Sequence, residues 1–384
     1  MPLEVLSSPV PRPAQTAVWY TRCPVPNALG LALRAGHFHE EFAEGTGVAF
    51  RSVLDAPDSA VHDAHYYGTL PNALRLGGNI PPIWARSRGA NTRLIGIAWT
   101  TAPAPILALR TSGIRSAADL KGKRLLVVRR PDEEIDFPYA GALRNYEVAL
   151  ATAGLTLDDV VLVEQQARPS SEHSKPTDPS VEKKPNRSHG GQRTIVPLLQ
   201  GEVDAIVAHG PAAVELAQGF DLQVVHDLTE HPDPLQRFHN SIPRILTVDA
   251  GFIDQHFDLV VRILARLLEV PAWAAANIEQ AIHFTALEQG VSDALVAATY
   301  QDRLARELEL GLSAENIARL AAQKAFLLRR GFIQQDFELE QWIDARPLAT
   351  ARELVAERLR SGGPAPVAVK SSSFKVGRAG CVSR

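Results

Sequence analysis

Short strand-like segments alternate with helical segments along most of this chain of 384 residues. Segments such as 17–21, 125–128 and 159–164 are rich in branched and aromatic residues, and helical periodicity follows them. After a late strand at 241–248 only helices are expected, at 250–275, 277–289, 291–306, 313–330 and 348–360. This alternation predicts parallel sheets with helices on both faces.

Two such blocks followed by a late return of the chain predict a two-lobed α/β protein with a C-terminal helical cap. The ligand is expected in the cleft between the lobes, near the carboxyl ends of the strands. The expected boundaries are 17–107 with 240–360 for lobe 1, 108–239 for lobe 2 with a mobile excursion at 165–192, a flexible N-terminus at 1–16 and a disordered tail at 361–384. The excursion nearly lacks large apolar side chains, so it is expected to carry no chemistry.

The net charge and the cysteine count disfavour several classes of function. The formal net charge is −3, so no basic field favours nucleic acid or an anionic membrane surface. Two cysteines fit a reducing compartment, and no apolar run has the length of a signal peptide or a membrane span. We therefore expect a cytoplasmic monomer with neither a nucleic-acid partner nor a membrane insertion.

One of the two cysteines, Cys23, lies in the stretch Arg-Cys-Pro-Val-Pro-Asn-Ala-Leu at 22–29. The two prolines keep residues 22–25 out of a helix, and a helix is expected at 26–36. Cys23 is thus expected at a strand-to-helix junction, near the positive end of a helix dipole that favours a thiolate. A lone cysteine can equally be a small core residue, so other residues must decide.

The middle of the chain resembles the substrate-binding proteins of nitrate, sulfonate and taurine importers and the related thiamine-precursor enzymes. The resemblance is carried by Ala-Asp-Leu-Lys-Gly-Lys at 118–123 and Leu-Gln-Gly-Glu-Val-Asp-Ala at 199–205. It implies the type II periplasmic-binding-protein fold and says little about chemistry.

The first third resembles a narrower family, the 2'-hydroxybiphenyl-2-sulfinate desulfinases of dibenzothiophene desulfurisation. The matching residues are Tyr-Thr-Arg-Cys-Pro-Val-Pro-Asn-Ala-Leu at 20–29 and Arg-Leu-Gly-Gly-Asn-Ile-Pro-Pro at 75–82, and His65 and Arg75 keep the family's ten-residue spacing. The resemblance implies Cys23, His65 and Arg75 as catalytic residues. It also implies an aromatic sulfinate as substrate and neither a metal nor an organic cofactor.

Substrate binding is assigned to Arg75, Gly77, Gly78 and, at the position of a family tryptophan, Tyr146. A planar guanidinium such as that of Arg75 can bind two sulfinate oxygens, and glycines allow backbone N–H groups to approach an anion. Cys23 is expected to act as proton donor to the ring carbon or as nucleophile on sulfur, with His65 bonded to the thiol. Three readings remain open: this desulfinase, a non-catalytic binding protein of a sulfonate importer, or another enzyme using the same cleft.

Overall fold

The computed structural model describes residues 16–23, 25–43, 46–53, 66–99, 101–167 and 190–361, with the single residues 56, 61 and 64. The expected flexible ends and most of the 165–192 excursion lie outside these residues. The two ends of that excursion are regular structure, since residues up to 166 belong to a strand and residues from 190 onward belong to a helix.

A six-stranded sheet forms the larger part of the molecule. Its order is β11-β4-β10-β3-β1-β2, and its strands are β1 Thr16–Arg22, β2 Val48–Ser52, β3 Ala73–Gly77, β4 Thr92–Ala98, β10 Arg244–Asp249 and β11 Leu310–Gly311. β1 is parallel to β2 and β3, whereas β10 is antiparallel to both β3 and β4. The expected all-parallel sheet is therefore wrong here, because the chain returning from the second lobe inserts β10 in the opposite direction.

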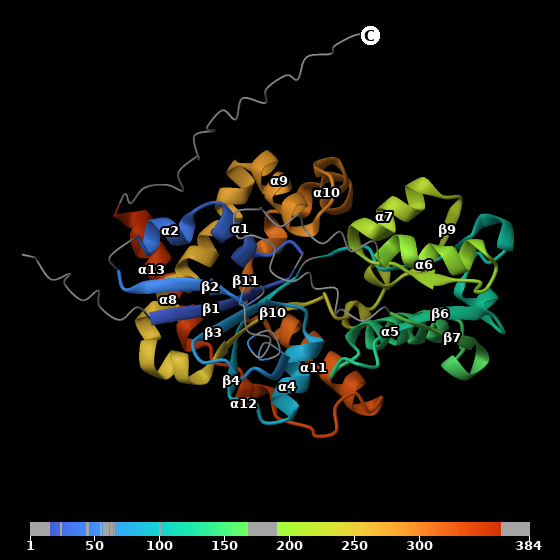
Figure 1. Ribbon diagram of the computed structural model, residues 1–384, viewed down its shortest axis with the longest axis horizontal. Helices are drawn as coiled ribbons and strands as arrows, with labels where there is room; N and C mark the ends of the chain where they lie inside the picture. Colours follow the sequence, from blue (N-terminus) through green and yellow to red (C-terminus); the bar gives the residue numbers. More distant parts are fainter. Residues whose placement is uncertain are drawn as a thin grey trace, which may run out of the picture.

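A smaller set of strands lies beside the first and is formed by the middle of the chain (Figure 1). It contains β5 Pro105–Leu109, β6 Arg124–Arg129, β7 Val161–Gln166, β8 Ile206–Val207 and β9 Leu222–Asp227. β6 and β7 are parallel, β5 is antiparallel to β8 and β9, and a bridge between Leu125 and Ala205 links the two groups. The helices of this lobe are α5 Phe137–Ala151, α6 Gly190–Leu199 and α7 Gly210–Gly219.

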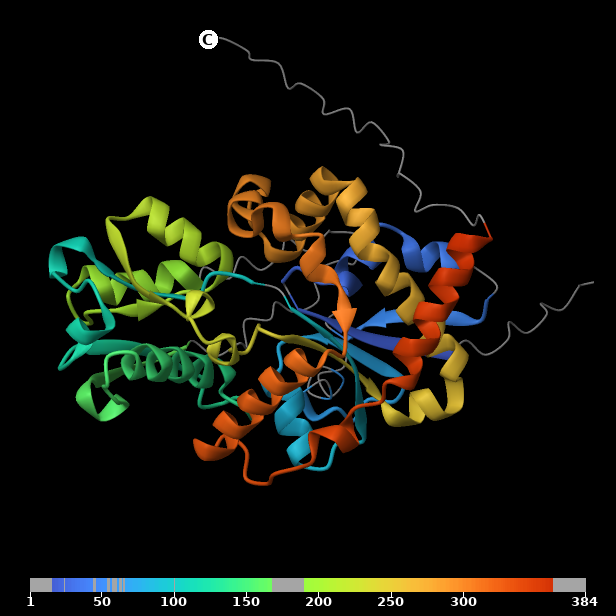
Figure 2. The ribbon, with the colours of Figure 1, turned by 180° about the vertical axis from the view of Figure 1, so that it is seen from behind.

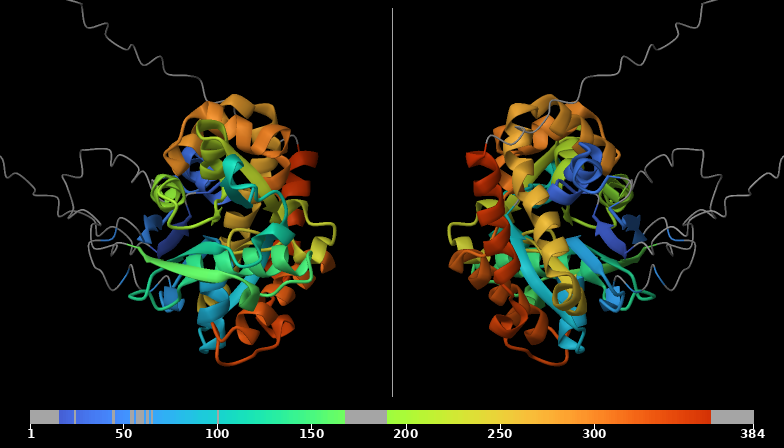
Figure 3. Two further views of the ribbon diagram at one scale, coloured as in Figure 1. Left: turned by 90° about the vertical axis from the view of Figure 1, so that its right-hand side faces the viewer. Right: turned by 90° about the vertical axis from the view of Figure 1, so that its left-hand side faces the viewer.

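Helices cover both faces of the six-stranded sheet (Figures 2 and 3). They are α1 Ala28–Arg34, α2 His37–Glu41, α4 Ile80–Ser87, α8 Ala250–Ala276, α9 Ile278–Gln289, α10 Asp293–Tyr300, α11 Ala314–Arg329, α12 Leu339–Trp342 and α13 Arg346–Arg360. Leu74 and Leu76 of β3 pack in the core with α1 and α8, whereas Ile245 of β10 packs in a second core with α4 and α11. Since side chains alternate along a strand, Arg75 and Gly77 face the second of these cores.

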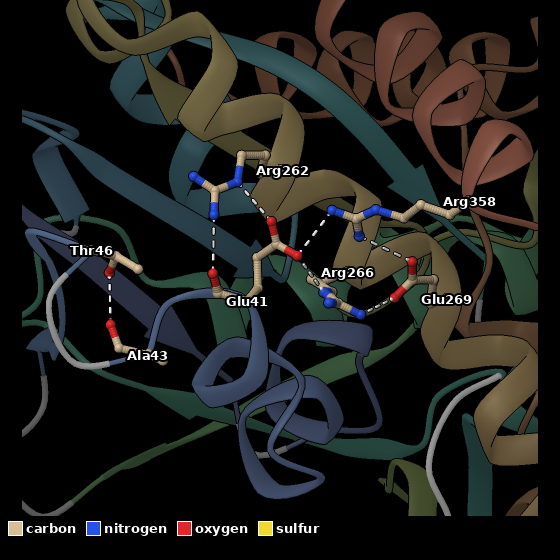
Figure 4. Close-up of polar contacts among 7 residues, drawn as sticks. All are labelled: Glu41, Ala43, Thr46, Arg262, Arg266, Glu269 and Arg358. Atoms are coloured by element: carbon tan, nitrogen blue, oxygen red, sulfur yellow. Dashed lines mark hydrogen bonds and ion pairs between the residues drawn. The ribbon is translucent and has the colours of Figure 1, made fainter. Parts of the chain in front are cut away.

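A buried carboxylate joins three helices of the larger lobe (Figure 4). Glu41 ends α2, and its side chain accepts hydrogen bonds from Arg262 and Arg266 of α8 at 2.6 and 2.9 Å and from Arg358 of α13 at 2.9 Å. Arg266 and Arg358 also bond to Glu269. Burial pushes the pKa of Glu41 upward, but the hydrogen bond from Arg262 and the charges of the three arginines hold it below its ordinary value.

Candidate active site

The side chain of one asparagine, Asn27, stabilises the turn that carries Cys23. Cys23 is half-buried and directly follows β1. Asn27 donates from Nδ2 to the carbonyls of Cys23 and Val25, at 3.2 and 2.8 Å, while its Oδ1 accepts from the Gly30 N–H at 2.8 Å. Because Asn27 is the N-cap, α1 begins at Ala28 and not at residue 26 as expected.

Strand register places Cys23 beside Gly77. Thr21 pairs with Arg75, and Arg22 pairs with Leu76, so the next residues on the two parallel strands are Cys23 and Gly77. A Cβ atom added at Gly77 would lie 2.1 Å from the Cys23 Sγ. Only glycine fits there, and the sulfur lies against the bare backbone of β3 at the carboxyl end of both strands, the edge at which such sheets bind ligands.

The second glycine of the pair, Gly78, packs against a different segment, residues 239–243. A Cβ atom at Gly78 would lie 2.7 Å from Oδ1 of Asn240, which accepts from the Ile80 N–H at 3.1 Å. Asn79 is fully buried and donates to the His239 and Pro243 carbonyls at 2.7 and 2.8 Å. Residues 239–243, which precede β10, thus fix the Gly77-Gly78 backbone from one side.

Arg75 turns its guanidinium toward this same backbone. Its Nη1 donates to the Gly78 carbonyl at 2.7 Å, and it lies with the Cys23 sulfur within 4 Å of the position that a Cβ at Gly77 would take. Burial lowers the pKa of Arg75, against the opposing effects of Cys23 and Tyr66. Its Nε is buried without a partner among the described residues. The guanidinium is therefore held at one nitrogen and keeps donors for an anion.

Two hollows help to locate the ligand. A cavity of about 30 Å³ lies beside Arg75, lined among others by Thr21 and Thr247, its neighbours on β1 and β10. A drug-sized ligand needs roughly 300 Å³ or more, so this cavity cannot take an aromatic ring. A larger hollow of about 640 Å³ between α5 and α11 is lined by none of the predicted site residues.

Tyr66 interacts with charged side chains of the second lobe as well as with the site. Tyr66, one residue after His65, has a pKa raised mainly by burial and next by the charge of Glu133, and it also interacts with Arg130, Arg75 and Cys23. Glu133 and Arg130 belong to the second lobe and pair with each other at 2.9 Å. Cys23 and Arg75 therefore lie near a tyrosine that also interacts with charged side chains of the second lobe.

Of the residues predicted for the site, the structure brings Cys23, Arg75, Gly77 and Gly78 together. His65 lies outside the described residues, so its role stays a prediction. Tyr146 is not part of the group: it is fully buried in the core of the second lobe, and its hydroxyl donates to the Leu126 carbonyl at 2.8 Å. Most of α5 is buried in this core, and the expected substrate contact of Tyr146 is withdrawn.

Sequence reasoning missed the residues that support the site. Asn27 stands in the motif at 22–29, but nothing in the motif assigns it a role of its own. Asn240 lies in a segment without a periodic pattern. Arg244 had a detectable signal, a single charge at the start of an apolar strand; it is 1% exposed and donates to the Pro26 carbonyl. Among the described residues no group of three or more His, Cys, Asp and Glu side chains is arranged for a metal ion.

Comparison with known proteins gives the same picture. The chain is 27% identical over 353 residues to a 2'-hydroxybiphenyl-2-sulfinate desulfinase of Rhodococcus erythropolis, covering 84% of this chain and 90% of the relative. The crystal structure of the desulfurization enzyme DSZB superimposes with a TM-score of 0.71 at 24% identity, over 88% of this chain and 99% of that one. The periplasmic aliphatic sulphonate binding protein SsuA from Escherichia coli gives a TM-score of 0.60 at 18% identity, over 86% and 92%. No family model matches the chain.

These findings confirm the predicted resemblance and the periplasmic-binding-protein-like fold. The lobe boundaries, the monomeric state and the cytoplasmic location stay predictions. No helix in the described part of the chain is both long and apolar enough to cross a membrane.

Proposed function

We propose that the protein is a Cys23-dependent desulfinase that hydrolyses the aryl C–S bond of an aromatic sulfinate and releases sulfite. The observation that carries the proposal is the placement of the Cys23 sulfur against the Gly77 backbone, with the Arg75 guanidinium near the same backbone. The 27% identity to the Rhodococcus desulfinase supports it. A further support is that a DSZB mutant of similar fold has been crystallised with biphenyl-2-sulfinic acid.

The reaction balances with water alone. An aryl sulfinate and one water give the arene and bisulfite: the C–S bond breaks, the ring carbon gains a proton and the sulfur gains an oxygen. The chain must hold an anion and bring a proton or a nucleophile to the reacting centre at about 3 Å. Arg75 serves the first need, because its free donors can bind sulfinate oxygens in a two-pronged arrangement.

Cys23 serves the second need by one of two routes. As a thiol it protonates the ring carbon, and the departing SO₂ takes up water to form bisulfite. As a thiolate it attacks sulfur, the arene leaves with a solvent proton, and water then releases bisulfite from the cysteine. A covalent sulfur adduct on Cys23, detected by mass spectrometry after rapid quenching, separates the second route from the first.

A non-catalytic anion-binding protein is the second candidate, favoured by the similarity of fold to SsuA. Both candidates use Arg75 for the anion, and they differ in whether the C–S bond is broken. Incubation with biphenyl-2-sulfinate should give sulfite and arene in equal amounts. Saturable binding of aryl sulfinates and alkyl sulfonates, with no sulfite formed under any condition, would favour the binding protein.

A further inference from the structure

We propose that Arg244 is a positioning residue for Cys23, which ties the cysteine turn to β10 and brings a second positive charge to that turn. The assignment rests on the proposed role of Cys23, but it is testable without any turnover. It gives a function to a buried arginine that neither the motif nor the sulfinate chemistry requires.

The first observation is a direct hydrogen bond. Arg244 is the first residue of β10, and its Nη1 donates to the carbonyl of Pro26, three residues after Cys23. Pro26 lies between the cysteine and Asn27, whose side chain closes the same turn. The bond therefore joins the Cys23 turn to the strand that lies beside β3, and the turn is held at both ends.

The second observation is the face from which Arg244 approaches. Ile245 pairs with Gly77 and Thr247 with Arg75, so these side chains share one face of the sheet. Side chains alternate along a strand, and Arg244 therefore lies on the opposite face. Cys23, next to Gly77, lies on the Arg75 face, and Arg244 approaches the same turn from the opposite face.

The third observation is the charge environment. Burial lowers the pKa of Arg244, against the opposing interactions with Tyr300, Cys23 and Glu307. A guanidinium starts from so high a value that it remains protonated at neutral pH. Tyr300 of α10 accepts a hydrogen bond from Arg244, and the buried neutral ring of His239 is its other titratable neighbour.

A buried charge of this kind costs several kcal/mol unless it is paired. Glu307 offsets part of it, but its carboxylate already accepts from the Thr101 N–H at 2.9 Å and pairs with Arg303 at 3.4 Å. An ionised Cys23 sulfur would supply a further counter-charge for Arg244. The described charged and titratable groups that interact with Cys23 are Arg75, Arg244 and Tyr66.

The test measures thiol reactivity. In a Cys381→Ser background, every alkylation event reports on Cys23, and the iodoacetamide rate is followed from about pH 5 to about pH 10. Arg244→Gln should raise the midpoint of this profile by about one pH unit, which lowers the rate below the midpoint about tenfold. Arg319→Gln is the matched control: Arg319 is also buried, but it stacks on Trp99 and pairs with Glu315, and the midpoint should not move.

A second variant protects the test against misfolding of the first. Glu307→Gln keeps an oxygen for the Thr101 N–H but removes the negative charge near Arg244, so the midpoint should fall by a few tenths of a pH unit. Circular dichroism establishes that each variant is folded. A folded Arg244→Gln protein with an unchanged midpoint overturns the proposal, as does a Glu307→Gln midpoint that stays or rises. Both alkylation midpoints can be measured even if the parent protein releases no sulfite, so failure of the proposed function is distinguishable from failure of this proposal.

Discussion

Replacement of Gly77 by alanine tests the packing at the centre of the site. The new methyl carbon would lie 2.1 Å from the Cys23 Sγ and 3.1 Å from its Cβ. Carbon and sulfur need roughly 3.5–4 Å, so the sulfur must move by about 1.5 Å. The Arg75 Nη1, at 3.8 Å from the same point, is already in contact and blocks one direction of escape.

A displacement of this size is expected to be costly for turnover. Misplacing a reacting group by about 1 Å lowers a rate roughly a hundredfold, which corresponds to about 2.7 kcal/mol in the activation barrier. Overpacking a closed position costs about 1–3 kcal/mol of unfolding free energy, so the variant should still fold. Gly77→Ala should therefore lose at least about a hundredfold in sulfite release while keeping a cooperative unfolding transition.

Sulfite release at saturating aryl sulfinate and urea denaturation provide the two measurements. Gly141→Ala is the matched control, because Gly141 lies inside α5 and an added Cβ meets nothing within 4 Å. That variant should gain about 0.5–1 kcal/mol of stability and keep full turnover. A folded Gly77→Ala protein with turnover within about twofold of the parent would refute the placement of Cys23 against β3.

Arg75→Lys should lower sulfite release at least about tenfold, because lysine keeps the charge but loses the two-pronged geometry. It should also cost about 1 kcal/mol of stability through the lost bond to the Gly78 carbonyl. Unchanged kinetics would place Arg75 outside the site. Glu41→Gln should lower the unfolding free energy by about 2–3 kcal/mol at pH 7, whereas Glu315→Gln, at a side chain 62% exposed, should change it by less than about 0.5. Because the folded-state pKa of Glu41 lies below its ordinary value of 4.5, the contribution is complete above that pH and is lost as pH falls through the folded-state pKa; equal stability of parent and variant at pH 7 would refute it. Deletion of 168–189 should leave both sulfite release and the denaturation midpoint nearly unchanged, and a large loss of either would show that the segment contributes to the site or the core.

The local pattern of the sequence predicts many of the elements, whereas the candidate site residues came from the resemblance to the desulfinases. The helix expected at 313–330 is α11, whose observed bounds fall within two residues of those expected. β3 escaped notice because its residues Ala-Leu-Arg-Leu-Gly run directly into a Gly-Gly pair that indicates a loop. Its role is visible only in three dimensions, where β1 and β10 pair with it on either side.

Pairing between strands that are distant in the sequence also explains why the direction of β10 and the supporting residues Arg244 and Asn240 were not predicted. The direction of β10 depends on how the chain returns from the second lobe, and no local pattern records that. Arg244 and Asn240 reach the site only because β10 lies next to β3, more than 160 residues away along the chain. Tyr146 is a related case, since an aligned position suggested a substrate contact, whereas the residue lies in the core of the second lobe.

Sulfite release by a Cys23→Ser variant tests the central claim most directly. Serine preserves the size of the side chain and the contact with Gly77, but its hydroxyl neither ionises near neutral pH nor matches the nucleophilicity of a thiolate. The account predicts that the parent forms sulfite and arene in equal amounts from biphenyl-2-sulfinate. It also predicts that the variant binds the same sulfinate with similar affinity by calorimetry and forms neither product. Turnover by Cys23→Ser at the parent's rate would contradict the account.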